Sequence, residues 1–166
     1  GQRYCPHCLG SDARPYLRRR WRIAAISACL RHQVVLLDQC PDCASSLMPH
    51  RTALGLARCW RCEAKLALAP ASPAHPGALA YSRLANAALD QGWVSLESHT
   101  FHYSPLFFVM LRQLTRVIAS GGRSQRLRDQ LRQEAEVSSQ PFDLSGRNAI
   151  EFLDAAETHR LHALAW

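Results

Sequence analysis

Residues 3–43 read RYCPHCLGSDARPYLRRRWRIAAISACLRHQVVLLDQCPDC, and residues 57–66 read ARCWRCEAKL. These two segments contain all seven cysteines of the 166-residue chain. Each cysteine belongs to a pair with a two-residue gap, and the pairs are Cys5/Cys8, Cys29/His32, Cys40/Cys43 and Cys59/Cys62. Four equal spacings with no cysteine left over predict metal ligands, because a tight turn of this length points both side chains at one ion.

Four such pairs supply the eight ligands of two closed, structural Zn²⁺ sites. Sequential pairing gives a site of three cysteines and one histidine, followed by a site of four cysteines. A cross-braced arrangement would join the first pair to the third and the second to the fourth. We favour sequential pairing, because WRIAAISAC and HQVVLLDQC indicate short strands that flank a turn. Disulfides, ordinary buried cysteines or a redox Cys-x-x-Cys would each leave part of the pattern unexplained.

The charge of the chain is uneven. Residues 1–66 contain eleven Lys and Arg against four Asp and Glu, whereas residues 67–166 contain nine of each, so the whole formal excess of +7 lies in the cysteine-bearing part. Two divalent ions held by seven thiolates would reduce the excess to about +4. The remaining basic face is compatible with nucleic acid without requiring it. No apolar run approaches the roughly 18–20 residues of a membrane span, and we expect a cytoplasmic protein.

The same segments carry residues that have no role in metal binding. They include Pro15-Tyr-x-Arg-x-x-Trp-Arg and the Leu36-Leu37 pair ahead of Cys-Pro-x-Cys. With them, residues 3–66 resemble the TniQ/TnsD family of bacterial transposition proteins. The matching positions are Tyr4, Cys5, Pro6, Cys8, Leu9, Pro15, Tyr16, Arg18, Trp21, Arg22, Cys29, His32, Leu36, Leu37, Cys40, Pro41 and Cys43.

The resemblance implies a non-enzymatic adaptor in DNA transposition. Family members join target recognition, by direct DNA binding or by an RNA-guided complex, to an AAA+ ATPase regulator that recruits the transposase. The expected partners are therefore such a regulator and target DNA or an RNA-guided complex; a homodimer is compatible with the sequence, and a membrane is not expected. The chain begins with Gly rather than Met, so we expect an excised fragment or a trimmed tag. Members of the family tend to carry a helix-turn-helix segment before the zinc region, and this segment is expected to be either absent or cut away.

Two other functions stay open at this point. One is a sequence-specific, zinc-dependent DNA-binding transcriptional regulator that uses the basic zinc face and a bundle helix. The other is an enzyme of the RING ligase type, which cross-braced ligation would favour and sequential ligation weakens. No glycine-rich phosphate loop, nucleophile elbow or carboxylate cluster accompanies the cysteines, so we expect no catalytic site.

We predict an α+β, mostly helical fold. A tandem zinc-ribbon-like module with short β-hairpins occupies residues 1–68, a proline-rich connector residues 69–77, and a bundle of about four helices residues 78–166. Prolines 70, 73 and 76 indicate a stiff linker rather than a buried element.

Apolar periodicity predicts the helices of the bundle. The first spans residues 78–91, buries Tyr81, Leu84, Ala85 and Ala88, and ends at Gly92. The second, over 105–119 with Ser104 as N-cap, is apolar nearly all round and should be the central helix, ended by Gly121-Gly122. A charged outer helix follows over 123–136. The last helix has Ser145 as cap and Ile150, Leu153, Leu161 and Leu164 as core positions.

Helices 105–119 and 123–136 also have the spacing of a helix-turn-helix. We favour a solvated amphipathic face for the arginines at 123, 126, 128 and 132, because helical pairs joined by a Gly turn are common.

The candidate nucleic-acid contacts are basic residues of the zinc module, because arginine suits phosphate. They are Arg18, Arg19, Arg20 and Arg22 around Trp21, together with Arg58, Arg61 and Lys65 beside the last cysteine pair. Four near-neighbours cannot all face one way, so packing competes with phosphate contact. We interpret Trp60 as a hydrophobic cover for the ion rather than a base-stacking platform. His159 and His162 stand three apart, but without a third ligand we expect them on a solvated helix face.

Overall fold

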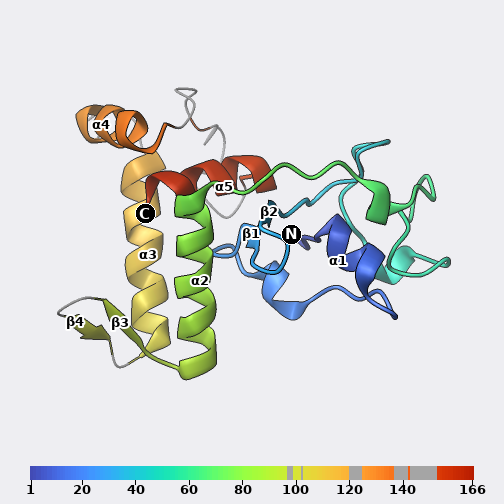
Figure 1. The fold of residues 1–166 in the computed structure, drawn as a ribbon, viewed down its shortest axis with the longest axis horizontal. Helices are drawn as coiled ribbons and strands as arrows, with labels where there is room; N and C mark the ends of the chain where they lie inside the picture. Colours follow the sequence, from blue (N-terminus) through green and yellow to red (C-terminus); the bar gives the residue numbers. More distant parts are fainter. Residues whose placement is uncertain (97–98, 102, 120–124, 137–141, 143–152) are drawn as a thin grey trace.

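The computed structural model describes residues 1–96, 99–101, 103–119, 125–136, 142 and 153–166. The cysteine-bearing region and the longer helices lie at opposite ends of the molecule (Figure 1). The predicted α+β, mostly helical class is confirmed. In chain order the elements are α1 (Pro6–Ser11), the 3-10 helix η1 (Arg19–Arg22), β1 (Ala28–Cys29), β2 (Val34–Val35), the 3-10 helices η2 (Pro49–Arg51) and η3 (Leu66–Leu68), α2 (Pro76–Gln91), β3 (Val94–Leu96), β4 (His99–Phe101), α3 (Ser104–Ala119), α4 (Gln125–Ala135) and α5 (Ala155–Leu164).

Short elements around one apolar cluster make up the cysteine-bearing region. Strands β1 and β2 pair antiparallel in the register Ala28↔Val35 and Cys29↔Val34. Tyr4 and Leu36 are fully buried, and the cluster reaches Ala85 on α2. Five of the seven cysteines are buried members of this apolar cluster: Cys5, Cys8, Cys29, Cys40 and Cys59.

The proline-rich segment between η3 and α2 also pairs with this region. The Val35 amide donates to the carbonyl of Ser72 at 3.0 Å, and the Ala74 amide donates to that of Gln33 at 2.8 Å. Pro73 is the residue opposite Val34, which suits an edge position because proline has no amide to donate. These residues thus connect two regions and also add an edge to the β1–β2 pair.

Helix α2 starts at Pro76, two residues earlier than predicted, and Gly92 ends it with a φ of 77° as expected. Tyr81, Ala85 and Ala88 are buried on one face, as the periodicity predicts, while Leu84 is half-buried. Between α2 and α3 lies the β3–β4 hairpin, with Val94 opposite Phe101, which the sequence analysis missed.

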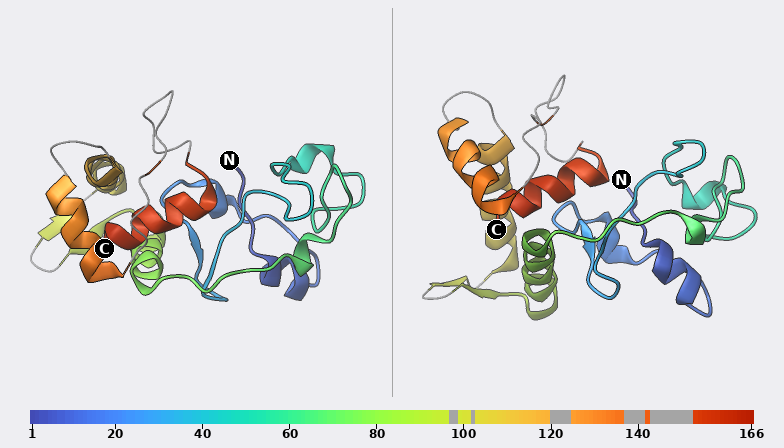
Figure 2. Two further views of the ribbon diagram at one scale, coloured as in Figure 1. Left: turned by 90° about the horizontal axis from the view of Figure 1, so that it is seen from above. Right: turned by 45° about the horizontal axis from the view of Figure 1, so that its top comes forward.

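Helix α5 packs across α2 and also contacts α3, α4 and β2. Two further views show it lying over α2, next to the cysteine-bearing region (Figure 2). The Asp154 side chain caps α5 by accepting from the Glu157 amide at 2.7 Å. The predicted cap Ser145 and core position Ile150 lie outside the described residues.

The prediction that α3 is the central helix was wrong. Phe107, Leu111 and Ile118 are buried, but Leu106 and Val109 on the other face are 58% and 55% exposed. Helix α3 therefore lies at the edge of the molecule (Figure 1). The predicted stop at Gly121-Gly122 lies outside the described residues, so the choice between the favoured solvated face and a helix-turn-helix stays untested. None of the described helices has the length and hydropathy of a membrane span.

Candidate metal centres

The first cluster joins Cys5, Cys8, Cys29 and His32. Cys8 Sγ lies 3.7 Å from Cys29 Sγ. The Nδ1 atom of His32 lies 3.5 Å from Cys5 Sγ, 3.3 Å from Cys8 Sγ and 3.8 Å from Cys29 Sγ. All three cysteines are buried.

The second cluster joins Cys40, Cys43, Cys59 and Cys62. Cys40 Sγ lies 3.6 Å from Cys62 Sγ, and Cys43 Sγ lies 3.7 Å from Cys59 Sγ. Cys62 is exposed and Cys43 half-buried, so this cluster is more open to solvent than the first.

Both clusters have the dimensions of a tetrahedral zinc site. Metal–sulfur bonds of about 2.3 Å and a metal–nitrogen bond of about 2.0 Å give tetrahedral edges of about 3.8 Å between sulfurs and about 3.5 Å between sulfur and nitrogen. The observed separations of 3.6–3.7 Å and 3.3–3.8 Å match them. They are far longer than the roughly 2.05 Å of a disulfide bond. The Cys₃His and Cys₄ clusters fit two structural Zn²⁺ ions with sequential pairing, and cross-bracing does not occur.

Three of the four ligand pairs sit on the same backbone turn. The amide four residues after the first ligand bonds back to its carbonyl, Gln33 to Cys29, Ala44 to Cys40 and Glu63 to Cys59, a bond that Leu9 also makes to Cys5. The flanking residues repeat as well, since Leu36, Leu47 and Leu66 donate to the carbonyls of Ser27, Asp38 and Ala57. One hairpin therefore recurs three times, and the Cys5/Cys8 pair, which leads into α1, is the exception.

The residue that closes each of these hairpins has a left-handed backbone. The φ angles are 53° at Gln33, 55° at Ala44 and 62° at Glu63, and each of these residues directly follows the second ligand. Because non-glycine residues rarely adopt this conformation, the three turns accept local strain to bring two ligands to one point.

Local hydrogen bonds and charges favour a bound cation. The Arg61 amide donates to Cys59 Sγ at 3.4 Å, and the Ser45 hydroxyl, 3.3 Å from Cys43 Sγ, lowers the pKa of that thiol to about 6. Burial, reinforced by the charge of Cys29, raises the pKa of Cys8 to about 11. Several thiolates this close together need a positive ion among them, and Zn²⁺ supplies it.

The arginine run is largely held by contacts within the protein. The Arg18 guanidinium lies between the rings of Tyr16 and Trp21, at 4.6 and 4.8 Å, and pairs with Asp12 at 3.1 Å. Asp12 also pairs with Arg31 at 3.2 Å. No spacing in the sequence signals that Arg18 and Arg31 share the carboxylate of Asp12.

The neighbouring arginines point in different directions. Arg20 forms an ion pair with Asp90 at the end of α2 and donates to Asn86 Oδ1 at 3.1 Å. The hydrogen bond from Arg20, reinforced by its charge, lowers the pKa of Asp90. Arg22 donates to Gln2 Oε1 at 2.8 Å, while Arg19 is exposed. Arg18, Arg19, Arg20 and Arg31 line a groove of about 790 Å³ between the first cluster and α2.

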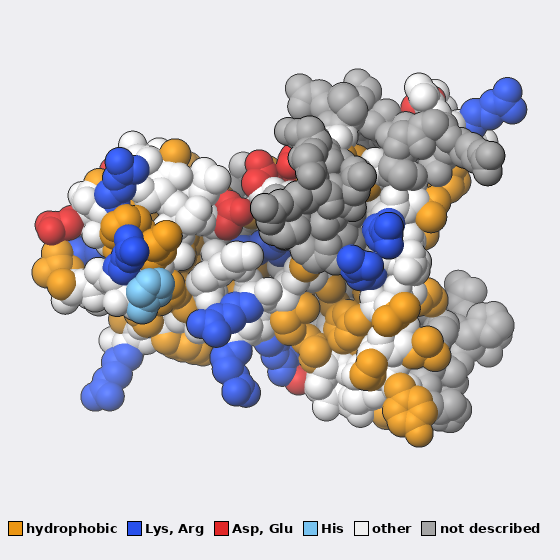
Figure 3. Space-filling model, turned by 180° about the vertical axis from the view of Figure 1, so that it is seen from behind, with side chains coloured by type: hydrophobic (Ala, Val, Ile, Leu, Met, Phe, Trp, Pro, Cys, Tyr) orange, Lys and Arg blue, Asp and Glu red, His pale blue; other side chains and the backbone are white. Residues whose placement is uncertain are grey.

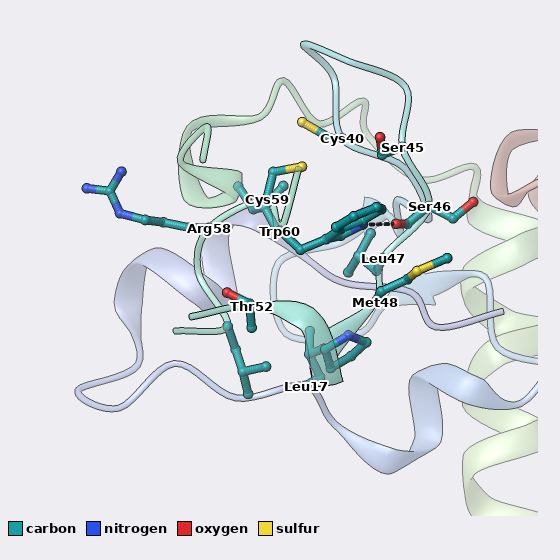
Figure 4. A pocket seen from close by; sticks show the side chains of 13 residues that line it. Leu17, Cys40, Ser45, Ser46, Leu47, Met48, Thr52, Arg58, Cys59 and Trp60 are labelled. Carbon is teal, nitrogen blue, oxygen red and sulfur yellow. Dashed lines mark hydrogen bonds between the residues drawn. The ribbon is translucent and has the colours of Figure 1, made fainter. Parts of the chain in front are cut away.

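The remaining predicted basic residues surround the second cluster. Arg58 donates to the carbonyl of Glu63 at 3.0 Å, Arg61 lies 3.4 Å from Ser45 Oγ, and Lys65 is exposed. Trp60 lies across a small pocket beside Cys59, with its indole N–H donating to the Ser46 carbonyl at 2.9 Å (Figure 4). The Arg51 guanidinium lies over the Trp60 ring at 5.2 Å, and the role of Trp60 as a cover for the ion stays a prediction.

The expectation for His159 and His162 was wrong, since both are buried between α5 and the cysteine-bearing region. His162 stacks on Tyr81 at 4.1 Å and its Nδ1 lies 2.8 Å from Ser27 Oγ. His159 Nε2 accepts from the His75 amide at 3.0 Å. Burial lowers the pKa of both rings, to about 4 for His159, so both are neutral near pH 7. They are packing residues of the α5 interface.

The model of the TniQ family matches residues 1–36, which include all four residues of the Cys₃His cluster and the arginine run. The resemblance is confirmed over these residues. No curated protein and no solved structure matches the chain.

Proposed function

We propose, from the match of residues 1–36 to the TniQ family, that the protein is a non-enzymatic adaptor in DNA transposition. It acts in the cytoplasm and links target recognition, on DNA or through an RNA-guided complex, to an AAA+ ATPase regulator and the transposase. The observation that carries the proposal is that the family match coincides with a complete Cys₃His cluster.

The metal sites support a structural rather than a catalytic role. Each cluster supplies four protein ligands, which fills a tetrahedral ion and leaves no position for substrate or water. Within the described parts of the chain, no third group of histidine, cysteine or acidic side chains could hold a metal ion. Zinc in this protein holds the hairpins together, and the folded hairpins present the surface that partners bind.

Contact with a nucleic-acid backbone would fall to the exposed cations of the zinc region. Arg19, Arg61 and Lys65 are exposed and belong to residues 1–66, the part of the sequence that carries the formal charge excess. In this proposal Arg18, Arg20 and Arg22 keep the shape of the surface through their contacts with Asp12, Asp90 and Gln2, and Arg58 through the Glu63 carbonyl.

The helical region would carry the protein–protein contacts of the adaptor. Arg3 joins it to the zinc region by donating to the Ile26 carbonyl at 2.8 Å and to Thr158 Oγ1 on α5 at 3.0 Å. The Ala155 amide at the start of α5 donates to Asp38 Oδ2 at 3.0 Å. Buried polar contacts of this kind keep a fixed geometry, so a DNA-facing surface and a partner-facing surface would hold a constant relation.

The test presents the zinc-loaded protein to both classes of partner. Fluorescence anisotropy with duplex DNA over a salt series measures backbone contact, and pull-down with the transposon's AAA+ ATPase measures adaptor function. We expect ATPase capture that a zinc chelator abolishes. If Arg19, Arg61 and Lys65 each neutralise one phosphate, their triple Ala variant should reduce the slope of log affinity against log salt by roughly 2.7. Arg83→Ala, an exposed arginine on α2, is the matched control.

The outcomes separate the two functional classes. Failure to capture the ATPase in the presence of zinc would overturn the adaptor proposal. Tight, sequence-selective duplex binding without ATPase capture would instead assign the protein to zinc-dependent transcriptional regulators.

A further inference from the structure

A cavity of about 220 Å³ lies where α2, α3 and α5 meet the zinc region. Its wall is mostly apolar, and every neighbouring element contributes to it: Ala25 from the zinc region, Tyr81 from α2, Leu111 from α3 and Leu161 from α5. An apolar cavity of about 150 Å³ is large enough to hold benzene. This cavity therefore has room for one aromatic ring that carries a small substituent.

Two buried polar side chains, Tyr81 and His162, form part of the wall. Each is 3% exposed, and their rings stack at 4.1 Å. His162 Nδ1 bonds to Ser27 Oγ, but neither His162 Nε2 nor the Tyr81 hydroxyl has a hydrogen-bond partner within the described parts of the chain. Because buried polar groups of native proteins are almost always hydrogen-bonded, two unpaired groups at one cavity indicate that they bond to what fills it.

The other polar side chains of the wall are engaged within the protein. The Thr115 and Thr158 hydroxyls donate to the carbonyls four residues earlier in the chain, at 2.9 and 2.7 Å. Arg112 is exposed and has an interaction of its own, so a ligand is not expected to depend on its charge. Polar recognition therefore falls to His162 and Tyr81.

A chain of hydrogen bonds determines which nitrogen of His162 carries the proton. Burial lowers the pKa of both His159 and His162, so each ring holds one proton near pH 7. His159 Nε2 accepts from the His75 amide, which places the proton of His159 on Nδ1, 3.5 Å from Ser27 Oγ. Among the described residues, the acceptor left for the Ser27 hydroxyl is His162 Nδ1, at 2.8 Å. His162 therefore carries its proton on Nε2, where it is a donor.

We propose that this cavity binds a small, neutral aromatic molecule whose substituent carries a hydrogen-bond-accepting oxygen. The oxygen accepts from the Nε2–H of His162, and the Tyr81 hydroxyl, which can donate or accept, offers a second bond. The ring lies against the apolar wall, where a charged group would lose its water without compensation. The surroundings are apolar as well, since hydrophobic side chains gather on the surface of the helical part of the molecule (Figure 3).

The site is separate from the transposition role. None of the residues that line the cavity is a metal ligand or one of the exposed cations proposed to contact DNA. His162 gains a function beyond packing, because its Nε2–H recognises the ligand. Ligand binding and partner binding can therefore fail independently of each other.

Two probes of the same shape test the inference on the zinc-loaded full chain. Acetophenone carries a carbonyl oxygen, and α-methylstyrene has a methylene group in its place. Saturation-transfer NMR titrations should show that both probes bind. His162→Phe keeps a ring beside Tyr81 but cannot donate, so it should weaken acetophenone about fivefold more than it weakens α-methylstyrene, which is the effect of one neutral hydrogen bond.

A second pair of variants locates the probes. Ala25→Leu adds bulk to the wall and should weaken the binding of both probes at least tenfold. Ala156→Leu makes the same change at an exposed position of α5 outside the cavity, so it is the matched control and should change neither affinity.

The tautomers can be measured without any variant. Long-range proton–nitrogen correlation NMR of the wild-type protein should show the proton of His162 on Nε2 and that of His159 on Nδ1. A proton on Nδ1 of His162 would remove the donor and overturn the inference.

Three further results would overturn the inference. If neither probe binds at millimolar concentration, the cavity holds only water. Equal weakening of both probes by His162→Phe would show a purely apolar cavity, and unchanged binding to Ala25→Leu would place the probes elsewhere. Circular dichroism checks that each variant is folded, and the tautomer measurement decides the role of His162 if His162→Phe is not.

Discussion

Mild acid should destabilise the protein through the buried histidines of α5. Burial and the nearby positive charge of His75 lower the pKa of His159 to about 4, whereas an unfolded histidine titrates near 6.5. The folded protein keeps this ring neutral, so below about pH 6.5 the unfolded chain binds more protons. The contribution of the buried neutral His159 ring to the free energy of unfolding is complete above pH 6.5 and is lost progressively as the pH falls towards 4.

The size of the effect follows from the two pKa values. Between pH 7 and pH 5, His159 alone should reduce the free energy of unfolding by about 2 kcal/mol. His162 also makes the protein less stable in acid. Burial is the main cause that lowers its pKa, and the positive charge of Arg3 lowers it further. Together they make α5 the acid-sensitive element of the fold.

Urea unfolding followed by circular dichroism at pH 7 and pH 5 measures this loss. Thiolate protonation also weakens zinc binding in acid, so zinc release is monitored with an indicator dye at both pH values. His159→Gln keeps an acceptor for the His75 amide and cannot titrate. The wild-type protein should lose about 2 kcal/mol more than this variant. Equal losses in both proteins would refute the assignment to His159.

Three further predictions concern the metal sites and the packing around them. Metal analysis should find two zinc ions per chain. A chelator should remove the ion of the Cys₄ cluster first, because one of its ligands, Cys62, is exposed. For the same reason the Cys62→Ser variant should retain one ion. Loss of both ions from Cys62→Ser would contradict this order. Ser27→Ala should lower the free energy of unfolding by about 1–3 kcal/mol, since His162 Nδ1 is left buried without its partner, and urea titration measures the loss. Ala44→Val should cost about 1–2 kcal/mol in the same assay while Ala44→Gly costs less than 1 kcal/mol, because the φ of 55° suits glycine; a Val variant as stable as the Gly variant would argue against strain at this turn.

The metal ligands were predictable because their chemistry is encoded locally. A two-residue gap determines which side chains share a turn, and the aliphatic segments around Cys29 and His32 form the expected β1–β2 pair. The end of helix α2 was predictable for the same reason, since Gly92 marks it, whereas Pro76, which begins the helix, was assigned to the connector. In each case residues close in sequence determine the local structure.

The remaining features depend on residues far apart in sequence. Buried His162 bonds to Ser27, which lies 135 positions away in the sequence, and Arg20 pairs with Asp90, which lies 70 positions away. Helix α3 misled the sequence analysis differently. Its apolar residues predict burial on all sides, yet one face has no cover within the described residues. Hydrophobicity identifies a surface that must be covered, but not whether the cover comes from the same chain.

The contact of α5 with the zinc region has a consequence for the order of folding. The ligands span only 27 positions in the Cys₃His cluster and 22 in the Cys₄ cluster, whereas Arg3 and Thr158 are 155 positions apart. Closing the longer loop costs more chain entropy, so the ions can bind before α5 packs against the zinc region. Removing α5 should therefore spare metal content while it loosens α2, and the metal-bound hairpins would serve as the template on which the end of the chain settles.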